Sequence, residues 1–223
     1  MIPFEYILSL PKSLYVSFRL LPFKQAIKVP ILVRYNCKLL NLQGLIKIDS
    51  GNVKIGMIQI GFGNVGIFDK KYERCILDIQ GVLEICGKTI FGRGSRICIG
   101  NNGVLRIGTN FSNTAKMTLI CFDKINIGND VLVSWDTHVM DTDFHNTINL
   151  ETGKISMINK PIIIGDRVWL GMRSVVLKGS NIPNGSIVAA NSLVNKSYDI
   201  ENCLLAGNPA EIRKMNVNLY REK

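Results

Sequence analysis

Residues 164–199 read IGDRVW LGMRSV VLKGSN IPNGSI VAANSL VNKSYD, six consecutive blocks of six residues. The first position of each block is aliphatic, and the fifth position of the first five blocks is Val168 or a serine. A helix would repeat about every 3.6 residues and a flat strand every two, so this period fits neither. It fits a short strand and a tight turn, with three blocks closing one turn of a coil. The aliphatic residues are Ile164, Leu170, Val176, Ile182, Val188 and Val194.

The same register extends toward the N-terminus with interruptions. Large apolar residues spaced by six stand at Ile79, Ile85, Phe91 and Ile97, and again at Ile127, Val133 and Val139. Before residue 75 the pattern is looser but remains glycine-rich and typical of strands. We therefore predict an all-β coil over residues 41–207.

The largest interruption is the stretch DTDFHNTINLETGKISMINK at residues 141–160, which lacks the six-residue pattern. A loop that protrudes from a regular scaffold is a frequent place for function. The chain has only two histidines: His145 lies at the base of this interruption, and His138 lies three residues before it. These two side chains are therefore the first candidates for chemistry.

The N-terminal segment, residues 1–40, mixes large apolar residues with lysine and arginine, and Glu5 is its only acidic residue. Its four prolines argue against one long amphipathic helix and favour helical and irregular pieces. Two interpretations stay open. The segment is a lid over one end of the coil, or it contacts an anionic membrane surface.

The C-terminal segment, residues 208–223, begins with Asn208 and Pro209, and Glu211 follows. This order matches a helix N-cap, a proline at the first helical position and a capping-box acid. We expect a short C-terminal helix here.

The composition limits which classes of ligand and partner we expect for this protein. The formal net charge is +10, from 27 Lys and Arg against 17 Asp and Glu, which favours anionic ligands. We expect no nucleic-acid partner, because no helix-turn-helix, RNP motif or Cys/His finger is present. The six cysteines form no CxxC pair and are predicted to be reduced core residues of a cytoplasmic protein. No apolar run is long enough for a transmembrane helix, and no residue cluster calls for a metal.

The hexads, the IGDRVWLG turn, the histidine loop and the terminal AGNPAEIRK together resemble the left-handed β-helix, hexapeptide-repeat acyltransferases over residues 75–215. The resemblance points to the O-acetyltransferases of bacterial surface polysaccharide and to the maltose and galactoside acetyltransferases. It implies a left-handed parallel coil and a homotrimer with active sites between neighbouring subunits. It also implies acetyl-CoA as co-substrate, no metal, and a sugar hydroxyl of capsule or O-antigen as the acceptor.

The resemblance assigns the general base to His145, where the loop leaves the coil. A sugar hydroxyl needs a base to take its proton while it attacks the thioester, and histidine suits this role. Asp143 or Asp141 would orient the imidazole, and the sequence leaves open which. His138 is the alternative base; it is otherwise a residue that touches the acceptor, with Asp141, or a turn or subunit-contact residue.

The resemblance also assigns the coenzyme-binding positions. The turn with Trp169, Gly171 and Met172 would border the pantetheine arm, although Trp169 also fits plain packing. Arg213 and Lys214 would hold a CoA phosphate, or form a solvated face of the expected helix. The chain departs from the family where Asn191 replaces a common Gly and Asn195 replaces a common Thr. The remaining positions assigned to CoA are Ala190, Asn195 and Lys196.

Other functions remain as alternatives. A small-molecule acetyltransferase acting on serine or a nucleotide sugar is one, and a non-catalytic scaffold of the same fold is another. A zinc enzyme on this coil would need three histidines per site, more than two per chain supply with this spacing. For the O-acetyltransferase we expect a cytoplasmic location, free or at the inner face of a membrane. The sequence does not name the sugar, the hydroxyl or the acyl chain.

Overall fold

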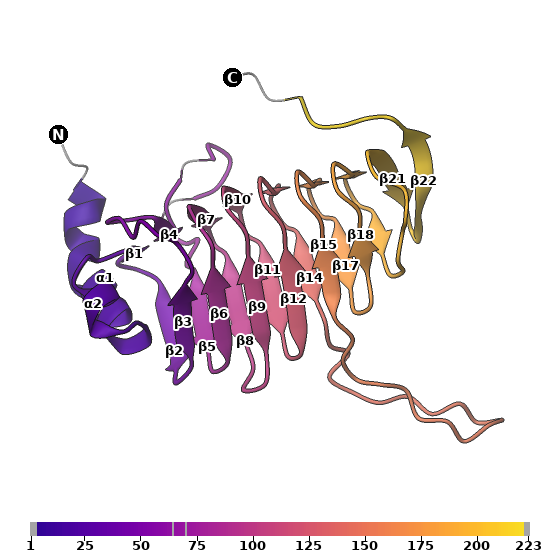
Figure 1. Cartoon of the computed structure of the whole chain (residues 1–223), viewed down its shortest axis with the longest axis horizontal. Helices are drawn as coiled ribbons and strands as arrows, with labels where there is room; N and C mark the ends of the chain where they lie inside the picture. The colour runs from indigo at the N-terminus through magenta and orange to yellow at the C-terminus, as the bar shows by residue number, and fades with distance from the viewer. Residues whose placement is uncertain (1–3, 64, 70, 221–223) are drawn as a thin grey trace.

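The computed structural model describes residues 4–63, 65–69 and 71–220. The chain winds into a coil whose parallel strands stack into three sheets (Figure 1). We name them sheet A, sheet B and sheet C, in the order in which the chain visits them. The predicted left-handed parallel β-helix is confirmed.

Each sheet is a stack of short strands, ordered from the N-terminal end of the coil. Sheet A contains β1 (Ile31–Val33), β4 (Ile58–Ile60), β7 (Thr89–Arg93), β10 (Phe111–Ala115), β13 (Leu132–Val133), β16 (Trp169–Leu170), β19 (Ile187–Val188), β21 (Cys203–Gly207) and β22 (Ala210–Met215). Sheet B contains β2 (Lys38–Leu42), β5 (Ile76–Ile79), β8 (Arg96–Ile99), β11 (Thr118–Cys121), β14 (His138–Met140), β17 (Val175–Leu177) and β20 (Leu193–Val194). Sheet C contains β3 (Leu45–Ile48), β6 (Val82–Ile85), β9 (Val104–Ile107), β12 (Lys124–Ile127), β15 (Ile162–Ile164) and β18 (Asn181–Ile182).

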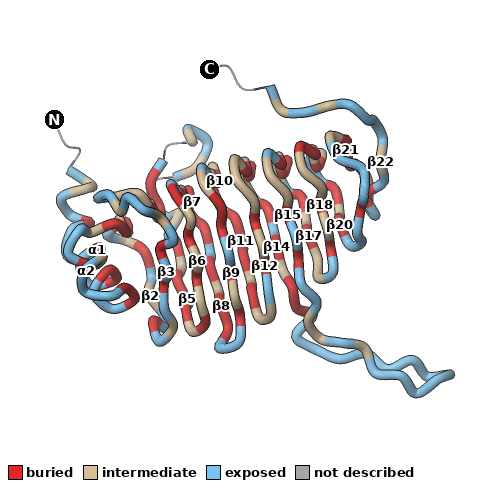
Figure 2. The backbone as a smooth tube through the Cα atoms, in the orientation of Figure 1, coloured by how far each residue is buried: buried red, intermediate tan, exposed pale blue. Residues whose placement is uncertain are grey.

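The hexad pattern explains the core. Every aliphatic first position from Ile164 to Val194 is at most 1% exposed, and the serines at the fifth position are buried behind them. Figure 2 shows buried residues along the whole coil and exposed ones on its projecting loop. One aliphatic side chain per strand therefore fills the interior, while a small residue leaves room where the chain turns.

The corners of the coil use left-handed backbone conformations. At the corner between sheets A and B, which we call the A–B corner, Asp136, Arg173 and Asn191 have φ values of 57°, 55° and 57°. Asparagine tolerates this region better than most residues, so Asn191 keeps the turn that glycine makes in the resembling family. The other two corners are named B–C and C–A in the same way.

A ladder of side chains runs along the C–A corner. The side-chain oxygen of Asn129 accepts the Thr109 N–H at 2.9 Å, and a carboxylate oxygen of Asp166 accepts the Asn129 N–H at 2.7 Å. The amide oxygen of Asn184 then accepts the Asp166 N–H at 2.8 Å. Each turn of the coil is thereby tied to the next one by the same kind of contact.

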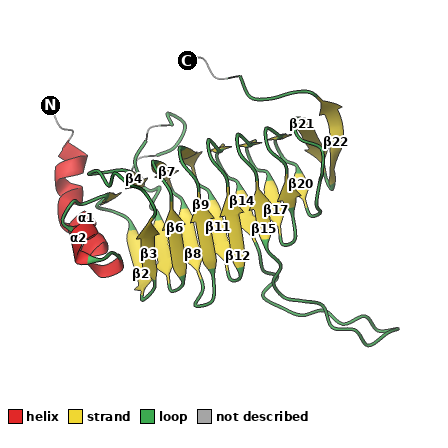
Figure 3. Cartoon of the chain, in the orientation of Figure 1, coloured by secondary structure: helices red, strands yellow, loops and turns green. Residues whose placement is uncertain are grey.

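The N-terminal segment caps the first end of the coil (Figure 3). It forms α1 (Phe4–Leu20) and α2 (Phe23–Ala26), and α1 packs against β1. Two expectations were wrong here. The helix continues through Pro11, because this residue lies on the exposed face, where water can bond the carbonyl that loses its partner. The coil also begins at β1 rather than at residue 41.

The predicted C-terminal helix was wrong as well. Residues Ala210–Met215 form β22, which pairs antiparallel with β21 around a turn at Asn208 and Pro209. An Asn–Pro pair is also a turn signal, and the pairing covers the edge that β21 would otherwise expose. The hydroxyl of Tyr198 donates to the Ala210 carbonyl at 2.6 Å and holds the hairpin against the coil. Residues 221–223 lie outside the described part.

All six cysteines are free; four of them lie in the core, whereas Cys86 and Cys98, which were also predicted there, are only half-buried. Burial raises the pKa of the Cys75 thiol to about 11, which keeps it protonated at neutral pH. In the described residues we find no helix with the length and apolar character that spanning a bilayer requires.

Candidate active site

Residues 141–160 form an arm that leaves the coil between β14 and β15 (Figure 1). Its two sides run antiparallel, with bridges between Thr142 and Asn159 near the coil and between Ile148 and Ile155 farther out. Leu150, at the tip, is 92% exposed. The arm therefore has a fixed base, and its polar tip carries one exposed leucine.

Lys178 fixes the base of the arm. It follows β17 directly and is largely buried, and its ammonium lies 2.6 Å from the Asp143 carboxylate. The same ammonium donates to the carbonyl oxygens of Ile158, at 3.2 Å, and of Met157. One lysine thus binds both sides of the arm at once, and the partly buried ion pair is stronger than a surface pair.

His145 lies on the exposed surface just beyond this anchored base. The preceding residue, Phe144, packs its ring edge-on against Phe122, with centroids 5.2 Å apart. After it, the side-chain amide of Asn146 donates to the Ser156 carbonyl at 2.8 Å. The backbone on both sides of His145 is therefore held, while its imidazole remains accessible. His138 is exposed at the start of β14.

Asp141 and Asp143, the predicted orienting residues, are both engaged elsewhere. Asp141 is fully buried, and its two oxygens accept the N–H groups of Phe122 at 2.7 Å and Asp123 at 2.9 Å. Burial raises the pKa of Asp141, and these two hydrogen bonds oppose that rise. Asp143 pairs with Lys178, so in the described residues no hydrogen bond joins either carboxylate to His145.

Four of the predicted coenzyme-binding residues lie together at the A–B corner. The indole N–H of Trp169 donates to the Ser134 hydroxyl at 3.0 Å, and the Met172 carbonyl accepts the Asn191 N–H at 3.0 Å. A Cβ added at Gly171 would lie 2.7 Å from backbone atoms of the neighbouring turn, so only glycine fits there. Ala190 is exposed on that next turn.

The other predicted coenzyme-binding residues lie elsewhere. Asn195 and Lys196 are exposed at the B–C corner, and Lys196 pairs with Glu211 at 2.8 Å, a hydrogen bond that raises the pKa of Lys196. Arg213 donates from Nε to the Ala206 carbonyl at 3.3 Å. Lys214 is exposed opposite Leu204 in the terminal hairpin. Both cations are on a strand rather than on the expected helix.

The single subunit therefore does not assemble the whole predicted site. The arm with His145 leaves at the B–C corner, whereas Trp169, Gly171, Met172 and Ala190 lie at the A–B corner. The three residues of β14 separate these corners, a span of about 10 Å.

Sequence reasoning missed Lys178 and Ser134. A signal for Lys178 was present, because the hexad register pairs Met140 with Leu177 and so sets Lys178 beside the first residue of the arm. Ser134 had no comparable signal, since its contact with Trp169 depends on the rotamer of the indole.

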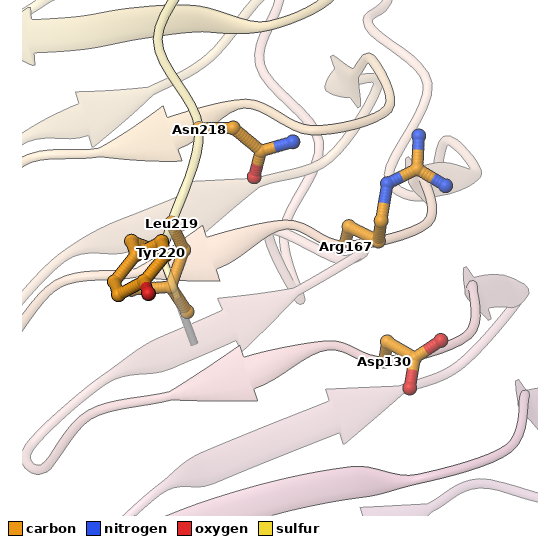
Figure 4. Close-up of a pocket in the computed structure, with 5 residues that line it drawn as sticks. All are labelled: Asp130, Arg167, Asn218, Leu219 and Tyr220. Carbon is orange, nitrogen blue, oxygen red and sulfur yellow. The ribbon is translucent and has the colours of Figure 1, made fainter. Parts of the chain in front are cut away.

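A separate hollow lies at the C–A corner, below the C-terminal tail. It is lined by Asp130 and Arg167 from two stacked turns and by the tail residues Asn218, Leu219 and Tyr220 (Figure 4). None of these five residues had a role predicted from the sequence. Across the described ranges, no group of three or more His, Cys, Asp or Glu residues is arranged to hold a metal ion.

Comparisons with known proteins agree with this architecture. No family model matches the chain. The chain is 28% identical over 148 residues to WbbJ of Escherichia coli K12, which carries a provisional assignment as an O-acetyl transferase of lipopolysaccharide biosynthesis; the match covers 63% of this chain and 75% of WbbJ. It is 27% identical over 207 residues to an uncharacterised 24.8 kDa protein of the cps region of Klebsiella pneumoniae, with 91% and 87% of the two chains covered. Among solved structures, the polysialic acid O-acetyltransferase OatWY superposes with a TM-score of 0.50 at 25% identity, over 86% of this chain and 91% of that one.

Proposed function

We propose, on the premise that this chain is an acetyl-CoA-dependent O-acetyltransferase of the hexapeptide-repeat class, that it acetylates a sugar hydroxyl during surface-polysaccharide biosynthesis. The observation that carries the proposal is an accessible histidine at the anchored base of an arm that leaves the coil. WbbJ is provisionally assigned to lipopolysaccharide biosynthesis, and OatWY is a polysialic acid O-acetyltransferase, which supports a sugar acceptor.

The proposed reaction is direct transfer. His145 takes the proton of the sugar hydroxyl while that oxygen attacks the thioester carbonyl of acetyl-CoA. A carbon–oxygen bond forms, the carbon–sulfur bond breaks, and the proton passes from the imidazole to the departing CoA thiolate. Lys178 and Asp143 hold the base of the arm, so that the imidazole stays in place during the reaction.

The proposed assembly is a homotrimer with shared sites. In this proposal His145 of one subunit meets the A–B corner of its neighbour, where Trp169, Gly171 and Ala190 would contact the pantetheine arm. The separation of the two corners within one subunit supports this arrangement. His138 would contact the acceptor, and Arg213 and Lys214 would bind a CoA phosphate. We place the protein in the cytoplasm.

The first test is acetyl transfer by wild type, His145→Ala and His138→Ala to a panel of sugars, oligosaccharides, serine and nucleotide sugars. We expect His145→Ala to lose about two to four orders of magnitude in kcat while CoA binding stays unchanged, as for removal of a general base. His138→Ala is the matched comparison: loss of an acceptor contact should raise the KM for the acceptor, while kcat stays near the wild-type value. The reverse result would move the base to His138, and transfer only to serine or a nucleotide sugar would favour the small-molecule alternative.

The second test is complementation between two inactive variants. Ala190→Trp would block the coenzyme side of a site, and His145→Ala removes the base. If each site takes one part from each of two subunits, co-expressed variants form mixed trimers with some intact sites, and activity returns. Activity that stays absent in verified mixed trimers would contradict the shared site.

A further inference from the structure

The face of α1 that packs against the coil is polar, because its hydroxyl groups accept hydrogen bonds from backbone N–H groups at an otherwise unpaired strand edge. β1 is the outermost strand of sheet A, so one side of its backbone lacks a neighbouring strand. The hydroxyls of Ser9 and Ser13 accept the N–H groups of Tyr35, at 3.0 Å, and Val33, at 2.9 Å. These serines, together with Ser17, are fully buried. Small hydroxyl side chains let the helix backbone come close to the strand.

The opposite face of α1 is apolar and exposed. Seven large apolar side chains of α1 are between 40% and 71% exposed, and Phe23 in α2 (71%) and Ile27 just after it (54%) add to them. Folding of the single chain does not require this surface, because the helix is already fixed by its serine face. A continuous exposed patch of large apolar residues marks an interaction site. We call it the outer face of α1; it consists of Phe4, Ile7, Leu8, Leu10, Leu14, Tyr15, Phe18, Phe23 and Ile27.

The charge around the outer face is positive. Arg19, Lys24 and Lys28 are exposed on and beside the helices. Glu5, the only acidic residue between positions 4 and 30, turns inward and pairs with Arg34 at 3.4 Å and Arg93 at 3.2 Å. The described part of this segment therefore presents apolar groups and cations to solvent, with its one carboxylate facing the coil.

We propose that the outer face of α1 docks on an anionic lipid surface, with its aromatic and aliphatic side chains in the headgroup boundary and its cations on lipid phosphates. Apolar residues flanked by Lys and Arg are the composition that interfacial helices use. A second copy of the same face is a poor occupant, since an isologous contact would bring cation against cation without an acid to separate them.

This docking defines the acceptor further, on the basis of the proposed function. α1 stands across the end of the coil (Figure 1), so the coil would project away from the membrane. In sheet B, β14 is four strands beyond β2, and at about 4.8 Å per strand plus a helix about 10 Å thick the arm lies roughly 30 Å from the lipid. The acceptor hydroxyl would then belong to a glycan several sugar units away from its lipid anchor.

The test is co-sedimentation with vesicles of phosphatidylcholine, with and without phosphatidylglycerol. The wild type should bind only the anionic vesicles, and binding should fall as salt rises. Arg19→Glu/Lys24→Glu/Lys28→Glu should weaken binding about a hundredfold or more, because each basic residue near an anionic surface contributes about a factor of five. Ile7→Ser/Leu14→Ser/Phe18→Ser should also lose binding. The matched control is Ile67→Ser/Tyr72→Ser/Ile200→Ser, exposed apolar residues outside the two helices, which should bind like wild type.

Several outcomes would overturn the proposal. One is binding to neutral vesicles as strong as to anionic ones, and another is equal loss in the control. If the serine variant changes the oligomeric mass in analytical ultracentrifugation, the face is a protein interface. Circular dichroism checks the fold of each variant, and the charge-reversal variant tests the proposal if the serine variant unfolds.

Vesicle binding is also independent of acetyl transfer. His145→Ala should bind like wild type, so binding without activity on any sugar would reject the proposed function alone. For the acceptor, acetylation of lipid-linked sugars on vesicles should increase with glycan length, and equal rates for a single lipid-linked sugar would contradict the predicted distance.

Discussion

Each end of the coil has a strand edge that needs hydrogen-bond partners, and different elements supply them at the two ends. At the N-terminal end, the unpaired edge of β1 is satisfied by hydroxyl groups of α1, whose serines accept strand N–H groups. At the C-terminal end, β21 receives a true strand, β22, which turns back antiparallel beside it. Both solutions protect a strand edge from pairing with other chains.

Whether an end is capped by a helix or by a strand determines which side chains it exposes to solvent. A helix that bonds the edge through small polar residues is free to carry apolar residues on its other side, as α1 does. A capping strand alternates its side chains, and β22 presents Glu211, Arg213 and Lys214 to solvent. The two surfaces fit the two proposals above, docking on lipid at the N-terminal end and binding of a CoA phosphate at the C-terminal end.

The largest expected effect comes from breaking the N-terminal cap. Ser13→Leu removes the acceptor for the Val33 N–H and forces a large side chain into a fully buried contact. We expect a loss of about 3 kcal/mol in the free energy of unfolding, measured by urea titration. Leu14→Ser, the exposed neighbour, should change stability by about 0.5 kcal/mol or less. A larger loss for Leu14→Ser would mean that the outer face contributes to folding.

At the base of the arm, as at the N-terminal end, a side chain accepts hydrogen bonds from backbone N–H groups. Asp141→Ala leaves the N–H groups of Phe122 and Asp123 without acceptors, and should cost about 2 kcal/mol at acidic pH. Burial raises the pKa of Asp141, so the folded protein holds this proton more tightly than the unfolded chain does. The deficit of the variant should therefore be largest below the ordinary carboxyl pKa and shrink as pH rises through the raised value. Asp123→Ala, which keeps both N–H groups paired, is the control, and a deficit that grows with pH would contradict the assignment.

A smaller effect separates the two basic ends. Arg213→Ala/Lys214→Ala should raise the KM for acetyl-CoA about tenfold with little change in kcat, because charged contacts to phosphate would be lost. Arg19→Ala/Lys24→Ala should leave this KM unchanged and weaken binding to anionic vesicles instead. Steady-state kinetics and sedimentation of both double variants measure the two effects. An increase in the KM for acetyl-CoA in Arg19→Ala/Lys24→Ala would contradict the proposal that the two basic ends bind different ligands.

The smallest expected effect lies at the C-terminal cap. Tyr198→Phe removes one buried hydrogen bond to Ala210 and should cost about 1 kcal/mol, together with faster hydrogen exchange in β22. Tyr220→Phe, at an 83% exposed position, should have no measurable effect. Equal exchange rates in wild type and Tyr198→Phe would show that the strand pairing alone holds the hairpin.

The coil was predictable, because its repeating contacts are encoded locally. Each aliphatic first position, such as Leu170 or Val188, meets the same surroundings one turn above and below, so a six-residue pattern is enough to identify it. The relatives are O-acetyltransferases, provisionally so for WbbJ, which agrees with the resemblance drawn from the same motifs. The interruption at residues 141–160 was visible as the loss of that pattern.

The ends and the details of the site were not predictable in the same way. The start of a helix and a turn both fit the sequence at Asn208, Pro209 and Glu211. The hairpin forms because the edge of β21 would otherwise lack a partner strand. The contact between Asp143 and Lys178 joins residues far apart in the chain, and it redirects a carboxylate that local reasoning gave to His145. Whether His145 meets the coenzyme corner depends on a neighbouring subunit. The base and the coenzyme contacts therefore stay predictions.

The ladder of Asn129, Asp166 and Asn184 repeats one kind of contact from each turn to the next, as the stacked strands of the coil do. Because each turn contacts only its neighbours, a duplicated turn between β5 and β8 would keep both ends intact and lengthen the coil by about 4.8 Å. On the proposals above, the length of the coil would set the distance between the end that docks on lipid and the arm that carries His145, in steps of one turn. Gain or loss of single turns would change the distance between the lipid and the acetylated sugar, and the catalytic residues would stay the same.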